Sequence, residues 1–100
     1  SLKSKSVLLR NKFWTVSCVE NICTSQVNFT LINKNTETET VTVEISIYKK
    51  SDHKDMKNNT ILEQQFLDFK INPKDVLYYK KEYLLKHEPG LILIHLISDE

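Results

Sequence analysis

Two cysteines, Cys18 and Cys23, are the residues of this chain whose type and spacing are best suited to chemistry. Four residues separate them, whereas a redox-active dithiol has two intervening residues and lies at a helix N-terminus, which lowers the thiol pKa. A structural zinc site would need two further ligands, and no histidine pair at ligand spacing is present. Three states stay open for the cysteines: a disulfide, two buried free thiols, or a metal or redox site.

The other reactive residue types form no pattern that a reaction needs. No serine lies in a glycine-flanked nucleophile turn, and the single glycine, Gly90, cannot build a phosphate-binding loop. The carboxylates Glu37, Glu39 and Glu44 alternate with threonines, which is typical of a solvated strand face. We therefore expect a protein that is not an enzyme and that uses no cofactor.

The three histidines, His53, His87 and His95, are far apart in the sequence. The first lies in Asp52-His53-Lys54-Asp55, which offers a cation too few converging donors and is flanked by lysines. The sequence therefore predicts no metal site, and a solvated loop is the better interpretation of this segment.

A β-hairpin would position the two cysteines. Apolar residues share one face of a strand pattern with a period of two in two segments: Trp14, Val16 and Cys18, and then Cys23, Val27, Phe29 and Leu31. Antiparallel pairing that sets Cys18 opposite Cys23 also sets Trp14 opposite Val27, so that inward residues face inward residues. At directly opposed positions two cysteines come close to disulfide geometry, and a disulfide would indicate an oxidising compartment.

The composition favours strands along the whole chain. Its 100 residues include nine Ile, seven Val and eight Thr but no Ala, the best helix former. The segment from Thr40 to Tyr48 alternates apolar and polar residues, and residues 49–59 form a polar stretch that we expect to be a surface loop. Asn72-Pro73-Lys74-Asp75 fits a type I turn, and Glu88-Pro89-Gly90 fits a type II turn with positive φ at the glycine.

Residues 60–87 allow two interpretations. Leu62, Phe66 and Phe69 have helical spacing, but Leu67, Phe69 and Ile71 alternate as in a strand, and we favour strands. The predicted fold is all-β: one domain over residues 1–100, an antiparallel β-sandwich of six to seven strands. The alternative is an α+β domain with two helices in 60–87. The expected core residues are Trp14, Val16, Val27, Phe29, Leu31, Val41, Val43, Ile45, Ile47, Phe69, Ile71 and Leu93.

The order of these features resembles the immunoglobulin-like or fibronectin III-like accessory modules of bacterial extracytoplasmic proteins. The resemblance rests on four segments: the strand and Asn-rich turn at 29–35, the alternating strand at 41–48, the strand and Pro turn at 69–75, and the Pro-Gly turn and apolar strand within 83–96. Unlike this chain, such modules have glycines at several turns. The resemblance implies an immunoglobulin-like fold in a periplasmic, cell-surface or secreted protein.

Charge and length exclude several partners. A formal net charge of +1 with a single arginine lacks the basic patch of a nucleic-acid-binding protein, and no apolar run reaches the roughly 18 residues of a membrane span. Four tyrosines are candidates for a protein-interaction surface, or else shield sheet edges: Tyr48, Tyr78, Tyr79 and Tyr83.

We expect a structural or protein-interaction module of an exported or envelope protein, with a protein partner and an oligomeric state that the sequence leaves open. Two alternatives remain. One is a cytoplasmic assembly or regulatory domain with reduced cysteines, and the other is a carrier of a small ligand or metal on the hairpin thiols.

Overall fold

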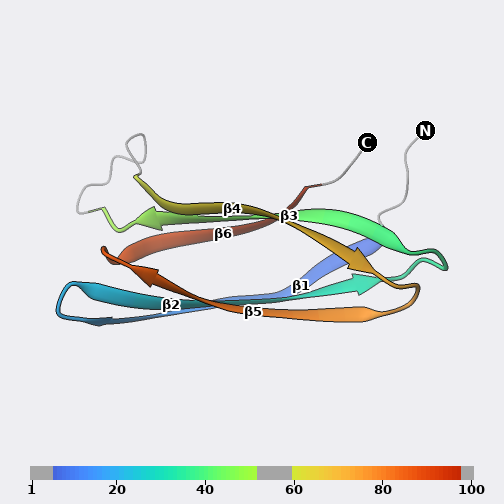
Figure 1. Cartoon of the computed structure of the whole chain (residues 1–100), viewed down its shortest axis with the longest axis horizontal. Helices are drawn as coiled ribbons and strands as arrows, with labels where there is room; N and C mark the ends of the chain where they lie inside the picture. Colours follow the sequence, from blue (N-terminus) through green and yellow to red (C-terminus); the bar gives the residue numbers. More distant parts are fainter. Residues whose placement is uncertain (1–5, 52–59, 98–100) are drawn as a thin grey trace.

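The computed structural model describes residues 6–51 and 60–97, and within them it contains six β-strands and no helix. The strands are β1 (Val7–Val19), β2 (Ile22–Asn33), β3 (Glu39–Lys49), β4 (Ile61–Ile71), β5 (Val76–Leu85) and β6 (Pro89–Ile97). They form two antiparallel sheets of three strands, in the orders β1-β2-β5 and β4-β3-β6. The sheets face one another as two layers (Figure 1), as in a β-sandwich. The predicted all-β class is confirmed.

The alternative of two helices in residues 60–87 is wrong. Both apolar segments of this region are strands, β4 and β5, and the side chains in them alternate between the interior and solvent. Phe66, which helical spacing would have placed with Leu62 and Phe69, is 59% exposed. The alternation of apolar and polar residues predicts the structure of this segment correctly, because each strand packs one face against the opposite sheet and exposes the other.

The core lies between the sheets and draws residues from all six strands. Seven of the expected core residues are buried: Val27, Phe29, Leu31, Val43, Ile45, Ile47 and Ile71. Trp14, Val41 and Phe69 are partly buried against them, and Val16 is half-buried. Five further apolar residues that are not among the expected core residues are buried: Val7, Tyr83, Leu85, Ile92 and Ile94. Cys23 is buried, as its predicted inward position requires, whereas Cys18 opposite it is exposed.

Leu93 was expected in the core and is 47% exposed, so that expectation is wrong. The last strand is apolar at nearly every position, which gives no indication of the face that is buried. Its pairing with β3 sets the phase, because Ile94 lies opposite Ile45 and Ile92 lies opposite Ile47. Both β3 residues point to the interior, so the even-numbered residues of β6 do as well.

Two predicted turns differ from their expected types. Lys74 has a φ of 59°, which at the third position of Asn72-Pro73-Lys74-Asp75 is typical of a type II turn. Gly90 does not have a positive φ and belongs to β6. This strand instead requires a glycine because the end of β3 passes close by: a Cβ on Gly90 would lie 2.7 Å from Lys50 Cα.

The predicted surface loop at 49–59 lies largely outside the described residues. Lys49 is the last residue of β3, and its backbone N–H donates to the carbonyl of Thr60 at 2.8 Å, just before β4. The ends of the segment are thus held together by the sheet that contains β3 and β4.

Candidate functional site

The β1–β2 hairpin holds the two cysteines in the predicted register. Cys18 lies opposite Cys23, Val16 opposite Ser25 and Trp14 opposite Val27. Strand pairing continues to Val19 and Ile22, so the connection has only two residues, Glu20 and Asn21. Their φ angles of 53° and 75° are those of a type I′ turn, whose twist matches that of a hairpin.

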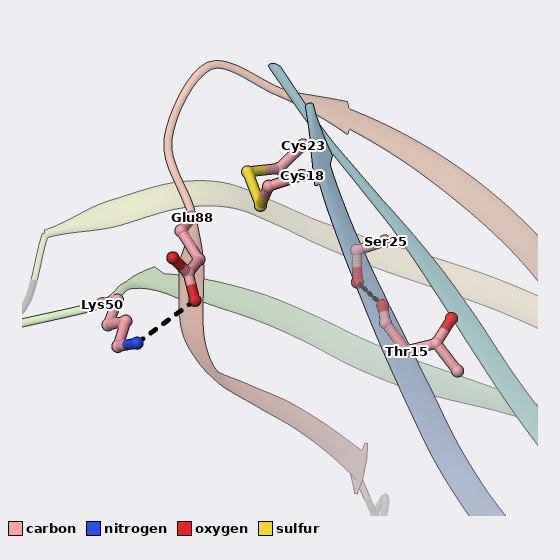
Figure 2. Close-up of a disulfide and its surroundings, with 6 residues drawn as sticks. All are labelled: Thr15, Cys18, Cys23, Ser25, Lys50 and Glu88. Atoms are coloured by element: carbon pink, nitrogen blue, oxygen red, sulfur yellow. Dashed lines mark hydrogen bonds and ion pairs between the residues drawn. A yellow bond between two sulfur atoms is a disulfide. The ribbon is translucent and has the colours of Figure 1, made fainter. Parts of the chain in front are cut away.

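The sulfur atoms of Cys18 and Cys23 are joined at 2.04 Å, with their Cα atoms 4.0 Å apart. With a two-residue turn, Val19 and Ile22 form the hydrogen-bonded pair that closes the hairpin. The next pair, Cys18 and Cys23, is therefore a non-hydrogen-bonded pair, the type in which opposed Cα atoms lie closest. Figure 2 shows the sulfur atoms on the side of the hairpin where Lys50 and Glu88 form an ion pair at 3.3 Å. Both sulfurs are used in this bond, which leaves no thiolate for a metal or a redox partner.

The four tyrosines do not share one surface. Tyr78 lies on the outer face of the first sheet and is 80% exposed, whereas Tyr48 lies half-buried on the outer face of the second sheet. Tyr79 and Tyr83 point inward from β5, and the Tyr79 ring stacks on Phe29 at 4.7 Å. Of the four, Tyr78 is therefore the one that offers a large exposed ring.

Tyr83 belongs to a polar group between the layers, on the side where β4 and β5 lie. Its hydroxyl donates to Gln65 Oε1 at 2.8 Å, and Lys81 Nζ donates to the same oxygen at 3.3 Å. Burial raises the pKa of the Tyr83 phenol above its ordinary value, and the neighbouring Tyr79 raises it further. This phenol stays protonated at neutral pH, so it acts as a hydrogen-bond donor that satisfies a half-buried amide.

A second polar group lies on the outer face of the second sheet. Ser46 Oγ donates to Glu44 Oε2 at 3.0 Å, Gln64 Nε2 donates to the same oxygen at 3.1 Å, and His95 Nδ1 lies 3.8 Å from Glu44 Oε1. Serine, histidine and carboxylate are the components of a hydrolytic triad, but there the histidine receives the serine proton. Here the serine donates to the carboxylate and is only 1% exposed, so the arrangement does not activate a nucleophile.

The remaining sequence candidates are dispersed. His87 lies exposed in the β5–β6 connection, and Asp52-His53-Lys54-Asp55 falls outside the described residues. Residues 6–51 and 60–97 contain no group of three His, Cys, Asp or Glu side chains placed to hold a metal ion. They also contain no helix long and apolar enough to cross a membrane.

A surface that the sequence analysis did not single out lies on the outer face of the first sheet. The register places three outward rows side by side: Leu8, Ile32 and Val76, then Arg10, Thr30 and Tyr78, and then Phe13, Asn28 and Lys80. Phe13 is 59% exposed and Tyr78 is 80% exposed. We call these nine residues the outer aromatic face.

The outward positions of both rings follow from alternation: that of Tyr78 along β5, and that of Phe13 as the neighbour of the inward-pointing Trp14 on β1. Phe13 comes directly after a register shift between Arg10 and Phe13, where Asn11 has a φ of 56°. Such a β-bulge places an additional residue in one strand and changes which side chains share a face. The bulge therefore places Leu8 and Arg10 on the same face as Phe13, which strict alternation along β1 would not do.

No protein-family model, no curated protein and no solved structure matches this chain.

Proposed function

We propose that this chain is a non-enzymatic structural or protein-interaction module of an exported or envelope protein. The observation that carries the proposal is the outer aromatic face, where two exposed rings flank a polar central strand and Arg10 and Lys80 lie beside them. Aromatic residues and arginine are enriched in protein interfaces, because they bury a large area while keeping polar contacts. A face that combines exposed aromatic rings with basic and polar groups is typical of a binding surface.

The disulfide supports the exported location. Cysteines stay reduced in the cytoplasm of most organisms, whereas disulfides persist in the periplasm, at cell surfaces and in secreted proteins. The Cys18–Cys23 bond closes a hairpin end at which Cys18 and the turn residues are exposed, while Cys23 is buried.

The strand order supports an immunoglobulin-like assignment within this proposal. In immunoglobulin-type domains the first, second and fifth strands pair in one sheet, and the C and F strands are neighbours in the other. Here β1-β2-β5 form one sheet, and β3 lies next to β6. β4 occupies the place beside β3 that strand C′ has in variable-type domains.

In-cell photo-cross-linking tests the interaction. A photoreactive amino acid in place of Tyr78 is expected to form an adduct with one defined protein in the native host. The matched position is Lys70, which is exposed on the outer face of the other sheet and is expected to give no such adduct. Phe13→Ser should weaken the adduct at position 78. Equal adducts at both positions, or none at either, would contradict the proposed surface.

The location is tested on the cysteines of protein isolated from its own host. Under non-reducing conditions the intact mass is expected to show no added alkyl group, because both sulfurs are bonded. Two readily alkylated thiols in the folded protein would instead indicate a reducing compartment and would reject export.

A further inference from the structure

Every open β-sheet ends in strands whose outward N–H and C=O groups lack a strand partner, and such edges pair with other chains unless they are blocked. The two sheets of the described residues have four edge strands: β1 and β5 in the first sheet, β4 and β6 in the second. Proteins block edges with charged side chains, bulges or inward-pointing charges, so the four strands can be compared on this basis.

Three of the edges are blocked. β1 carries Arg10 and Lys12 at its bulge, where the register with β2 shifts. β5 contains Lys80 and Glu82, and its Lys81 points inward to Gln65. The β4 edge is also charged, since this strand includes Glu63, Asp68 and Lys70.

The β6 edge is different. Its sequence, Pro-Gly-Leu-Ile-Leu-Ile-His-Leu-Ile, contains no Lys, Arg, Asp or Glu over the full strand Pro89–Ile97. Its register with β3 shifts once, at Gly90 between Pro89 and Leu91, and then runs without a shift to Ile97, so the unblocked part of the edge is residues 91–97. On the outer side Leu91 and Leu93 are 36% and 47% exposed, while the inner residues Ile92 and Ile94 belong to the core. From Leu91 to Ile97 this edge is therefore regular, free of Lys, Arg, Asp and Glu, and apolar except for His95 on its outer face.

We propose that β6 pairs with β6 of a second copy of this chain, antiparallel about a two-fold axis. The pairing joins the two second sheets into one six-stranded sheet, in the order β4-β3-β6-β6-β3-β4. An isologous contact sets each strand against its own sequence, and a strand with no charged residue brings no like charges together. The same pairing through β1, β4 or β5 would bring charged residues of one strand against those of its copy.

The blocked edges explain why assembly stops at two copies. A two-fold contact uses the β6 edge of both molecules at once, so the pair has only blocked edges left. The contact would cover Leu91 and Leu93, which lie next to Tyr48 and Ser46 on the outer face of β3. A strand pair of this length lies at the small end of stable interfaces, so we expect a dissociation constant in the micromolar range.

Sedimentation velocity over low micromolar to submillimolar concentrations tests the dimer, with the disulfide intact. The wild-type chain should shift from monomer to dimer mass, and the species should not grow beyond two copies. Leu93→Lys places a charge at the middle of the free edge and should weaken the association at least about tenfold. The substituted side chain is already half-exposed, so far-UV circular dichroism should match that of the wild type.

Leu84→Lys is the matched control, since Leu84 is 77% exposed on β5, whose edge is already charged. This variant should associate as the wild type does. The proposal is overturned by a wild-type chain that stays monomeric throughout, including the case in which β6 pairs with a strand of another protein. It is equally overturned if Leu84→Lys dissociates the dimer and Leu93→Lys does not. The outer aromatic face lies on the other sheet, so either proposal can fail without the other.

Discussion

At the scale of single residues, Asn33 is the side chain on which two separate connections depend. It is 1% exposed at the end of β2, and its Nδ2 donates to the carbonyls of Glu37, Ile71 and Asn72 at 2.9, 3.1 and 3.1 Å. Its Oδ1 accepts from the backbone N–H of Asn35 at 2.8 Å. One amide thereby holds the β2–β3 connection against the β4–β5 turn.

We expect Asn33→Ala to lower the free energy of unfolding by about 3 kcal/mol. The substitution leaves the backbone groups that bond to the Asn33 amide buried and without a hydrogen-bond partner. Chemical denaturation measures the change. Asn28→Ala is the control: Asn28 is half-buried on the outer face, accepts one bond from Gln26, and should cost less than about 0.5 kcal/mol. Similar losses in the two variants would show that burial of the Asn33 bonds contributes little.

Tyr83 should make the protein sensitive to alkali. The pKa of its phenol is raised in the folded state above the ordinary value of 10.0, chiefly by burial, so the unfolded chain loses this proton at lower pH. The contribution of Tyr83 to the free energy of unfolding is fully present below pH 10.0. It falls as the pH rises further, by up to about 1.4 kcal/mol per pH unit.

Urea unfolding at a series of pH values above neutrality measures this slope. Tyr83→Phe should flatten it, at a cost near neutral pH of about 1 kcal/mol for the lost bond to Gln65. Tyr78→Phe, at an exposed position on the same strand, should keep the wild-type slope. An unchanged slope in Tyr83→Phe would assign the alkaline loss to other groups.

At the scale of elements, the disulfide is expected to stabilise a hairpin that forms without it. The register of β1 with β2 is supported by inward pairs along both strands and by the type I′ turn, independently of the sulfur atoms. A loop this short restricts the unfolded chain little, so Cys18→Ser with Cys23→Ser should lower the free energy of unfolding by about 2 kcal/mol. The circular dichroism spectrum should be unchanged, and loss of strand content would show that the bond is needed to form the sheet.

The same hairpin shows how far sequence reasoning reaches. The β1–β2 register was predicted because apolar residues alternate on both strands, and an error of one residue would have turned every inward side chain outward. The phase of β6 was not predicted, because a run that is apolar on both faces carries no alternation and is fixed only by pairing with β3. The role of Gly90 was also missed, since the close approach of Lys50 depends on a residue 40 positions away in the chain.

The candidate surfaces were less predictable than the strands. Alternation indicates which residues point outward on one strand, but the outer aromatic face joins residues of β1, β2 and β5 across a bulge. The four tyrosines were grouped by residue type, and the structure distributes them over two outer faces and the interior. Both differences arise because a surface depends on the register of several strands at once.

At the scale of the whole molecule, three aromatic rings connect the two layers. Phe29 on β2 stacks on Tyr79 of β5 at 4.7 Å and meets the edge of Phe69 on β4 at 5.8 Å. Phe69 also meets Tyr79 at 5.5 Å, so each ring contacts the other two. Two of the three contacts cross between the sheets, and we expect the layers to unfold in one cooperative transition.

Trp14 fluorescence reports on the first sheet and far-UV circular dichroism on both, so the two denaturation curves should coincide. Phe29→Leu should shift both midpoints together, with a loss of about 1.5 kcal/mol, because it removes the ring contacts within and between the sheets. Phe66→Leu, on the exposed side of β4, should change stability by less than about 0.5 kcal/mol. If Phe29→Leu moves the fluorescence curve and leaves a later transition in circular dichroism, the two sheets are separate folding units. The aromatic contact would then hold them together without making their unfolding cooperative.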